Sequence, residues 1–150
     1  MVFGVTTRID PSIAINTKLD TGAKLPHRAH ATDAGADVFC RAGFTIAARG
    51  SAIVRTGVHV ELTPHTAGVL MSKSGLYINH DIVSTGLIDE GFTGEIIVKL
   101  TNLGDHAYHF DAGDKVSQLV VMPVLYPSFM QVSEISGGER GDAGYGSTGA

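Results

Sequence analysis

The chain has 150 residues, of which 43% are hydrophobic and 17% are charged, and this composition fits one folded domain rather than a disordered chain. Its net charge of −4 provides no overall basic field that would recruit nucleic acid. Because Cys40 is the single cysteine, an intramolecular disulfide and a zinc site built from cysteines are excluded.

Neither a secretory signal nor a membrane span is visible in the sequence. The first ten residues, MVFGVTTRID, lack a basic stretch followed by an apolar core. The longest apolar run of the C-terminal third, LVVMPVLY, is too short to cross a bilayer. We therefore expect a cytoplasmic protein that binds neither a membrane nor nucleic acid.

Alternation of apolar and polar residues dominates the chain and predicts β-strands. It is found in residues 13–20, 52–62 and 95–103, and the residues in phase are Ile13, Ile15 and Leu19, then Val58, Val60 and Leu62, then Ile96, Val98 and Leu100. Residues 115–125 become apolar on both faces, which is typical of a buried strand.

Glycine-rich turns recur at strand-length spacing between these segments, whereas only residues 72–83 suggest a short helical turn. Many short strands joined in this way predict an all-β barrel or sandwich. Apolar residues almost vanish after Ser136. We therefore expect one domain over residues 1–136, followed by a flexible glycine-rich tail over residues 137–150.

Four short segments carry candidate functional groups. Taken alone, the segments of Asp89, Asp37 and Lys73 are better explained as ordinary turns or loops. Asp89 lies in a predicted hairpin turn, where a carboxylate can act as a general base. Lys73 and Ser74 offer a charge and a hydroxyl to a phosphate. Asp37 lies among small residues, and Gln118 falls on a buried phase where its amide needs a ligand or a neighbouring strand.

The histidines and the cysteine suggest less. His27 and His30, like His106 and His109, are three residues apart, but neither pair lies in a predicted helix, so we expect surface histidines. Cys40 ends an apolar strand and is expected in the core.

The order of five segments is more specific than any one of them. HATDAGADVF, SKSGL, GLIDEGFTGE, AGDKVSQ and RGDAGYGSTG follow one another as the five signature motifs of the trimeric deoxyuridine triphosphatases (dUTPases) do. The chain resembles this family from Leu25 onward. The resemblance implies a jelly-roll β-barrel, a homotrimer whose active sites each draw on all three subunits, and Mg²⁺-dependent hydrolysis of dUTP to dUMP and pyrophosphate.

The resemblance also implies a role for each matching residue. Asp89 matches the catalytic aspartate that activates the attacking water. Phe92 stands where the family usually has tyrosine, and its ring would exclude a 2′-hydroxyl. The backbone of the hairpin, including Gly86 and Ile88, would bind the edge of uracil. Asp37 matches the aspartate that orders water around the metal, which is itself held by phosphate oxygens.

The remaining matches are expected to bind the triphosphate or to cover the base. Lys73 replaces the usual arginine, keeping the charge but losing the bidentate contact. Tyr145 would cover the uracil and Arg140 would bind the γ-phosphate. The other expected phosphate-binding residues are Ser74, Gly75, Gln118, Gly146, Ser147 and Thr148.

Two alternatives remain open at this point. One is an enzyme similar to dCTP deaminase, which shares the fold but lacks a tail of the GYGSTG type. The other is a catalytically inactive barrel that serves as a regulatory module. The presence of Asp89, Arg140 and the glycine-rich tail favours the triphosphatase over both.

Overall fold

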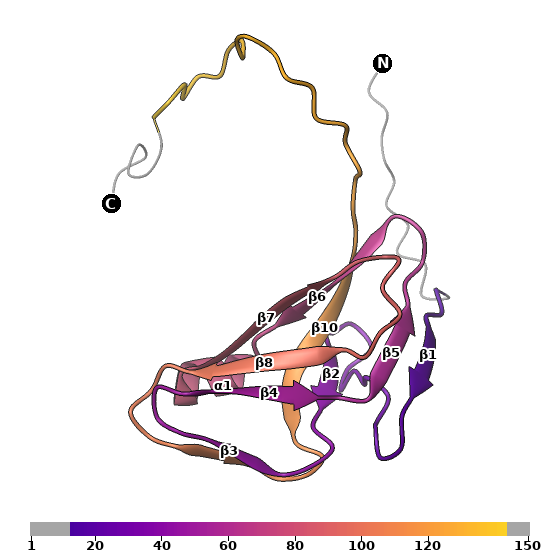
Figure 1. The fold of residues 1–150 in the computed structure, drawn as a ribbon, viewed down its shortest axis with the longest axis vertical. Helices are drawn as coiled ribbons and strands as arrows, with labels where there is room; N and C mark the ends of the chain where they lie inside the picture. Colours follow the sequence, from indigo (N-terminus) through magenta and orange to yellow (C-terminus); the bar gives the residue numbers. More distant parts are fainter. Residues whose placement is uncertain (1–12, 144–150) are drawn as a thin grey trace.

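The computed structural model describes residues 13–143, which form ten strands and one short helix (Figure 1). The elements are β1 (Asn16–Leu19), β2 (Ala36–Phe39), β3 (Phe44–Ile46), β4 (Ser51–Arg55), β5 (Val58–Glu61), β6 (Thr66–Met71), α1 (Ser74–His80), β7 (Ile82–Ile88), β8 (Ile97–Asn102), β9 (Tyr108–Phe110) and β10 (Lys115–Pro123). The prediction of an all-β fold with one short helical turn within residues 72–83 is confirmed.

The largest sheet has six antiparallel strands in the order β2-β10-β6-β7-β8-β4. Two further antiparallel pairs, β1-β5 and β3-β9, flank it (Figure 1). Among the strands of residues 13–143, β6, β7 and β8 are consecutive in the sequence and also paired with one another in the sheet. β10 lies between β2 and β6, so it joins segments that are far apart in the chain.

The core is filled by the residues that the alternation placed on one face. The alternating apolar residues of the segments 52–62 and 95–103 are all buried, as predicted. They are Val58, Val60, Leu62, Ile96, Val98 and Leu100. The expectation of a buried strand at residues 115–125 is only partly correct. The first half of β10 is largely buried, including Val116 and Leu119, whereas its apolar end is half-buried or exposed, Met122 being 40% exposed. Burial of these side chains away from water is the main force that closes the barrel.

The prediction for residues 13–20 is only partly correct. The strand there covers Asn16–Leu19, and Ile13 and Leu19 are exposed while Ile15 packs partly against the core. Among residues 13–143, β1 pairs with β5 alone, and Ile15 is the residue of this phase that packs against the core cluster. The alternating pattern therefore predicts the strand here correctly, but it does not predict whether the side chains of the strand are buried.

Asn102 is a buried polar residue that joins three segments at one end of the barrel. Its Nδ2 group donates to the carbonyl oxygens of His106 at 2.8 Å and Ala47 at 3.2 Å, and its Oδ1 accepts from the N–H of Gly104 at 2.9 Å. The side chain thus supplies partners for backbone groups that are shielded from water.

Asn102→Ala is expected to destabilise the fold by about 1–3 kcal/mol, because it leaves these backbone groups without partners. The shift in melting temperature at fixed protein concentration measures this loss. Thr101→Ala, one residue earlier on the more exposed face of β8, is the matched control and should change the melting temperature much less.

Beyond Pro123 the chain leaves the barrel as a C-terminal arm, residues 124–136, without further strands or helices (Figure 1). Its large apolar side chains are exposed, among them Leu125, Phe129, Met130 and Ile135. Within the described part of the chain, no helix has the length and apolar character needed to span a bilayer.

Candidate active site

The hairpin of β7 and β8 divides into two branches before it reaches its turn. The two strands pair with each other only from Ile82 with Asn102 to Ser84 with Leu100. Beyond this point residues 85–88 pair with β6, while residues 97–101 of β8 pair with β4. The two branches therefore turn unpaired backbone edges toward each other near the tip of the hairpin.

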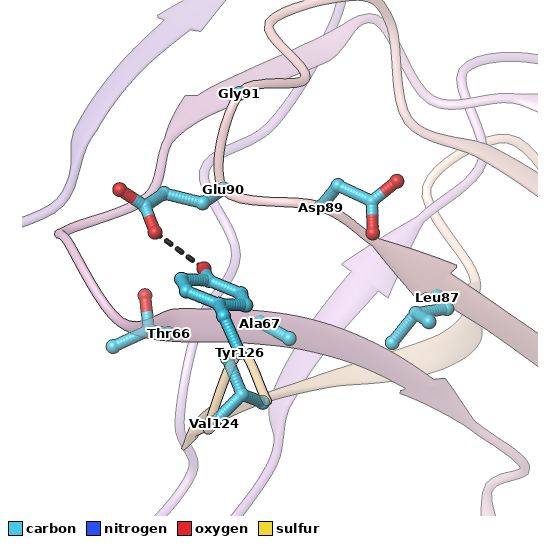
Figure 2. A pocket seen from close by; sticks show the side chains of 8 residues that line it. All are labelled: Thr66, Ala67, Leu87, Asp89, Glu90, Gly91, Val124 and Tyr126. Atoms are coloured by element: carbon cyan, nitrogen blue, oxygen red, sulfur yellow. Dashed lines mark hydrogen bonds between the residues drawn. The ribbon is translucent and has the colours of Figure 1, made fainter. Parts of the chain in front are cut away.

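Asp89 follows directly after β7, at the point where this split hairpin turns. Its carbonyl oxygen accepts a hydrogen bond from the N–H of Phe92 at 3.0 Å, which closes the turn. The Asp89 side chain is exposed and points away from Glu90 (Figure 2). An exposed carboxylate on a closed turn can accept a proton from a water molecule.

Glu90 ties this turn to the base of the C-terminal arm. Its Oε2 accepts a hydrogen bond from the hydroxyl of Tyr126 (Figure 2). The same oxygen also accepts a hydrogen bond from the N–H of His65. These two hydrogen bonds lower the pKa of Glu90, the bond from Tyr126 having the larger effect. The carboxylate therefore stays ionised and holds the turn against the start of the arm.

A pocket of about 450 Å³ lies between these segments. It is lined by Thr66, Ala67, Leu87, Asp89, Glu90, Gly91, Val124 and Tyr126 (Figure 2). Of the expected site residues it contains only Asp89, so it borders the candidate catalytic carboxylate without including the expected phosphate-binding residues.

The segments of the first, second and fourth motifs meet at the other end of β6. On β10, Gln118 lies opposite Asp37 of β2 and Met71 of β6. Its Nε2 donates to the carbonyl oxygen of Ser72 at 3.0 Å, so the partner of this amide is a neighbouring segment of the protein. A Cβ at Gly35 would lie 2.3 Å from Oε1 of Gln118, so a side chain there would force this amide to move.

Asp37 is the charged centre of this cluster and is only 6% exposed. Its Oδ1 accepts from Nζ of Lys73, and its Oδ2 accepts from Nζ of Lys115 at 2.8 Å. Burial acts to raise the pKa of Asp37, but the hydrogen bonds from Lys115 and Lys73 outweigh it and lower the pKa. The cluster therefore holds one carboxylate and two ammonium groups, with Ser74 and Gly75 exposed beside it.

The structure thus places the expected residues in two groups. One contains Asp37, Lys73, Ser74, Gly75 and Gln118, and the other contains Gly86, Ile88, Asp89 and Phe92. Arg140 lies in a turn beyond the arm, where its carbonyl oxygen accepts from the N–H of Ala143 at 2.8 Å. Tyr145, Gly146, Ser147 and Thr148 lie outside the described residues. The histidines that lie three residues apart in the sequence, His27 with His30 and His106 with His109, are all exposed, as predicted. Cys40 is buried, also as predicted.

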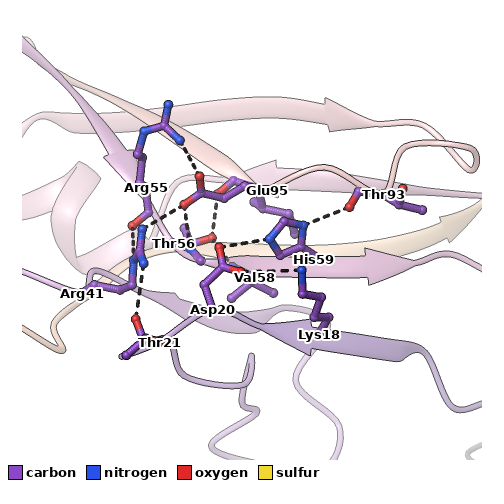
Figure 3. A network of polar contacts seen from close by, with 12 residues as sticks. Lys18, Asp20, Thr21, Arg41, Arg55, Thr56, Val58, His59, Thr93 and Glu95 are labelled. Carbon is purple, nitrogen blue, oxygen red and sulfur yellow. Dashed lines mark hydrogen bonds and ion pairs between the residues drawn. The ribbon is translucent and has the colours of Figure 1, made fainter.

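Sequence reasoning missed two residues beside these groups. Lys115 lies within the fourth motif, but its pairing with Asp37 depends on the register of β10 against β2. Glu95 ends the third motif and accepts hydrogen bonds from Arg55, from Arg41 and from the N–H of Gly57 (Figure 3). The one sequence signal that could have identified Glu95 is its position at the end of the third motif.

Comparison with known proteins identifies the family. The sequence model of the dUTPase family matches residues 21–149 of the chain. The chain belongs to the dUTPase family. A deoxyuridine 5'-triphosphate nucleotidohydrolase of Clostridium acetobutylicum is 40% identical over 135 residues, which cover 88% of this chain and 93% of the relative. The enzyme of the same name from Tropheryma whipplei (strain Twist) is 39% identical over 85% of this chain and 90% of its own length.

Solved dUTPase structures share the fold. The dUTPase of Staphylococcus bacteriophage 80alpha with dUPNHPP is 29% identical, with a TM-score of 0.85 over 91% of this chain and 99% of the phage chain. A mutant dUTPase from phage phi11 of S. aureus, solved for the coordination of a structural Mg(II) ion, is 27% identical, with a TM-score of 0.75 over 81% and 98% of the two chains. The predicted jelly-roll β-fold is confirmed.

Proposed function

We propose that this dUTPase family member hydrolyses dUTP to dUMP and pyrophosphate, using a water molecule activated by Asp89. The observation that carries the proposal is the exposed Asp89 carboxylate at the tip of the split hairpin, within a chain whose relatives are named for this reaction. In the reaction, Asp89 accepts a proton as the water oxygen bonds to the α-phosphorus. The bond from that phosphorus to the bridging oxygen breaks, and pyrophosphate leaves.

The unpaired backbone edges of the split hairpin support a role in binding uracil. Around Gly86 and Ile88, peptide groups that β8 does not pair are available as donors and acceptors for the base edge. Phe92 is 46% exposed, and its ring lies directly over Gly94, where a Cβ would be 2.6 Å from Cζ. We propose that this ring packs against the deoxyribose and leaves no room for a 2′-hydroxyl.

The second group of residues supports a role in binding the triphosphate. Lys73 already contacts a carboxylate, so a phosphate would replace Asp37 as one partner of its ammonium group. Ser74 and Gly75 are exposed at the start of α1, and Gln118 donates to the carbonyl oxygen of Ser72, two residues before Ser74. The tail of residues 137–150 would act as a lid, with Arg140 on the γ-phosphate, Tyr145 on the uracil, and Gly146, Ser147 and Thr148 on the phosphates.

The residues present fit Mg²⁺ that is held by the nucleotide. Among residues 13–143, no group of three or more histidine, cysteine, aspartate or glutamate side chains could hold a metal ion. Both oxygens of Asp37 accept hydrogen bonds from lysines, so this ionised side chain is suited to ordering water near the ion. Magnesium would neutralise charge on the triphosphate. Asp37 would begin to order water near the ion once Lys73 turns away from it toward the phosphate.

The distance between the two groups supports a homotrimer with shared active sites. Ser72 is held opposite Ser84 by two hydrogen bonds, of 2.9 and 3.0 Å, and Asp89 lies five residues further along extended β7. Five residues of strand span about 16 Å. This separation favours an arrangement in which Asp89 and Lys73 of one chain serve different nucleotides. A second subunit would bring its Asp89 to the phosphate-binding residues of the first, and the tail would come from a third.

The outer face of the six-stranded sheet supports the same assembly. Ile53 of β4 is 70% exposed, Leu87 of β7 is 70% exposed and Ile97 of β8 is 44% exposed. Apolar side chains spread over neighbouring strands are typical of a surface that is buried by another subunit. The exposed apolar side chains of the C-terminal arm add a second such surface.

Ile53→Asp is expected to convert the trimer largely into monomers, because a carboxylate would be buried at the interface without a partner. Light scattering coupled to size-exclusion chromatography measures the mass. Leu25→Asp, at a comparably exposed apolar residue outside the sheet, is the matched control and should remain trimeric. Trimers of both variants at equal concentration would contradict the assigned interface.

Isotope labelling tests the proposed reaction. In water enriched in ¹⁸O, attack on the α-phosphorus places the label in dUMP, whereas attack on the β-phosphorus places it in pyrophosphate. We expect label in dUMP alone. Label in pyrophosphate, or release of inorganic phosphate in place of pyrophosphate, would contradict the mechanism.

A further inference from the structure

His59 of β5 connects two segments that are distant in the sequence. Its Nδ1 lies 3.0 Å from the carbonyl oxygen of Thr93, one residue after Phe92 (Figure 3). Its Nε2 lies 3.1 Å from Oδ2 of Asp20, which follows β1. The His59 side chain is only 19% exposed, so water competes weakly for these contacts.

The two partners of His59 determine which charge state of its imidazole ring can form both hydrogen bonds. A carbonyl oxygen and a carboxylate oxygen are acceptors, so each ring nitrogen must donate a proton to complete both hydrogen bonds. A neutral imidazole has one N–H and can complete only one of them. His59 therefore holds Thr93 and Asp20 together as an imidazolium.

The neighbouring charges favour this protonated form. The pKa of His59 is raised, most by the carbonyl of Thr93 and next by Asp20, and the pKa of Asp20 is lowered by its hydrogen bond with His59. Lys18, whose Nζ lies 3.9 Å from Oδ1 of Asp20, opposes protonation of His59. Arg41 also faces Asp20.

The loop that follows Phe92 is thus held at two points of different character. At Glu95, the carboxylate pairs with Arg55 at 2.6 Å and Arg41 at 3.3 Å and accepts from the N–H of Gly57 at 2.9 Å. Arginine does not lose its proton in the physiological range, so this point is insensitive to pH. At Thr93, the contact depends on the proton of His59.

We propose that His59 is a positioning residue whose protonation fixes the Phe92 loop and thereby makes the exclusion of ribonucleotides depend on pH. The inference rests on the proposed function, in which the Phe92 ring packs against deoxyribose. Below the pKa of His59 the loop is held at both points. Above it, His59 keeps one N–H, which the charged carboxylate of Asp20 attracts more strongly than the carbonyl oxygen of Thr93 does. The loop is then held mainly at Glu95, and the ring of Phe92 gains freedom to admit a 2′-hydroxyl.

The kinetic test compares kcat/KM for dUTP with kcat/KM for UTP between about pH 5.5 and pH 8.5. In the wild-type protein the dUTP preference should fall by about fivefold as His59 loses its proton. In His59→Gln both N–H groups lie on one nitrogen and the other polar atom is an acceptor oxygen, so the side chain cannot place a donor at both ring-nitrogen positions. Its preference should therefore be low and insensitive to pH. His106→Gln, at an exposed histidine in the turn after β8, is the matched control and should follow the wild type.

Two readouts on the trimer are independent of turnover. In NMR the His59 ring should titrate above its ordinary pKa, and Asp20→Asn should lower that value. Amide exchange at Thr93 and Gly94 should accelerate in His59→Gln at acidic pH and become equal to the wild type at alkaline pH. Because the pKa is raised in the folded state, the stabilisation by His59 is present at low pH and lost as pH rises through that pKa.

A dUTP preference that varies with pH equally in the wild type and His59→Gln would overturn the proposal. So would a His59 pKa at or below its ordinary value, or amide exchange that is the same in both proteins at acidic pH. If the wild type turns over neither nucleotide, the proposed function fails, while the NMR and exchange results still decide whether His59 fixes the loop.

Discussion

Asp89→Asn is expected to reduce kcat for dUTP hydrolysis by about 10²–10⁴-fold, because an amide cannot accept the proton of the attacking water. The affinity for a non-hydrolysable dUTP analogue should change little, since asparagine keeps the size of the side chain and the closed turn. Steady-state kinetics and calorimetric titration measure the two quantities separately.

Asp105→Asn is the matched control for this substitution. Asp105 is an exposed carboxylate in the turn after β8, where it pairs with Arg49 at 2.7 Å. Its loss should leave kcat unchanged. A kcat in Asp89→Asn within a factor of about two of the control would remove Asp89 from the role of general base.

Deletion of residues 138–150 is expected to lower kcat/KM by about 10²–10³-fold while leaving the melting temperature unchanged. The deletion removes Arg140 and Tyr145, which are proposed to bind the γ-phosphate and cover the uracil. A charge-assisted contact to phosphate, as proposed for Arg140, contributes about 1.5–3 kcal/mol, and stacking of an aromatic ring on a base, as proposed for Tyr145, contributes about 1–3 kcal/mol. Together they account for an effect of this size. The last strand ends at Pro123, so the deletion does not shorten the barrel.

A shorter deletion, of residues 149–150, keeps the proposed binding residues and is the matched control. It should retain nearly the full kcat/KM. If the longer deletion lowered the melting temperature as much as Asn102→Ala does, the tail would be part of the folded barrel and the proposed lid would be wrong.

The strands could be predicted where both the alternation and the topology favour burial. Val58 and Val60 face the core because β5 faces the interior, and the alternating pattern identifies that face directly. The pattern of Ile13 and Leu19 is equally regular, but these two residues are exposed, and of this phase only Ile15 packs against the core cluster. Periodicity indicates which side chains share one face of a strand, but it carries no information on whether that face packs against the core.

The site was predictable to the extent that its residues lie in ordered motifs. The resemblance named Asp37, Lys73 and Gln118, and the structure brings all three together on neighbouring segments. The double pairing of Asp37 with two lysines depends on β10 lying between β2 and β6, which no local pattern specifies.

The split of the hairpin and the contacts of His59 could not be predicted for the same reason. The pattern of residues 82–102 is that of a simple hairpin, and the division arises because β6 and β4 pair with its two branches. His59 occupies an ordinary polar position of an alternating strand. Its two partners lie 39 and 34 residues away, at distances that only the folded chain makes short.

The central claim, that this family member hydrolyses dUTP specifically, is tested most directly by pyrophosphate release from a panel of nucleotides. Purified protein with Mg²⁺ is incubated separately with dUTP, dTTP, dCTP and UTP, and initial rates are compared at equal concentrations. We predict rapid release from dUTP and much slower release from the other three. Release from dCTP as fast as from dUTP, or no release from dUTP, would contradict the claim.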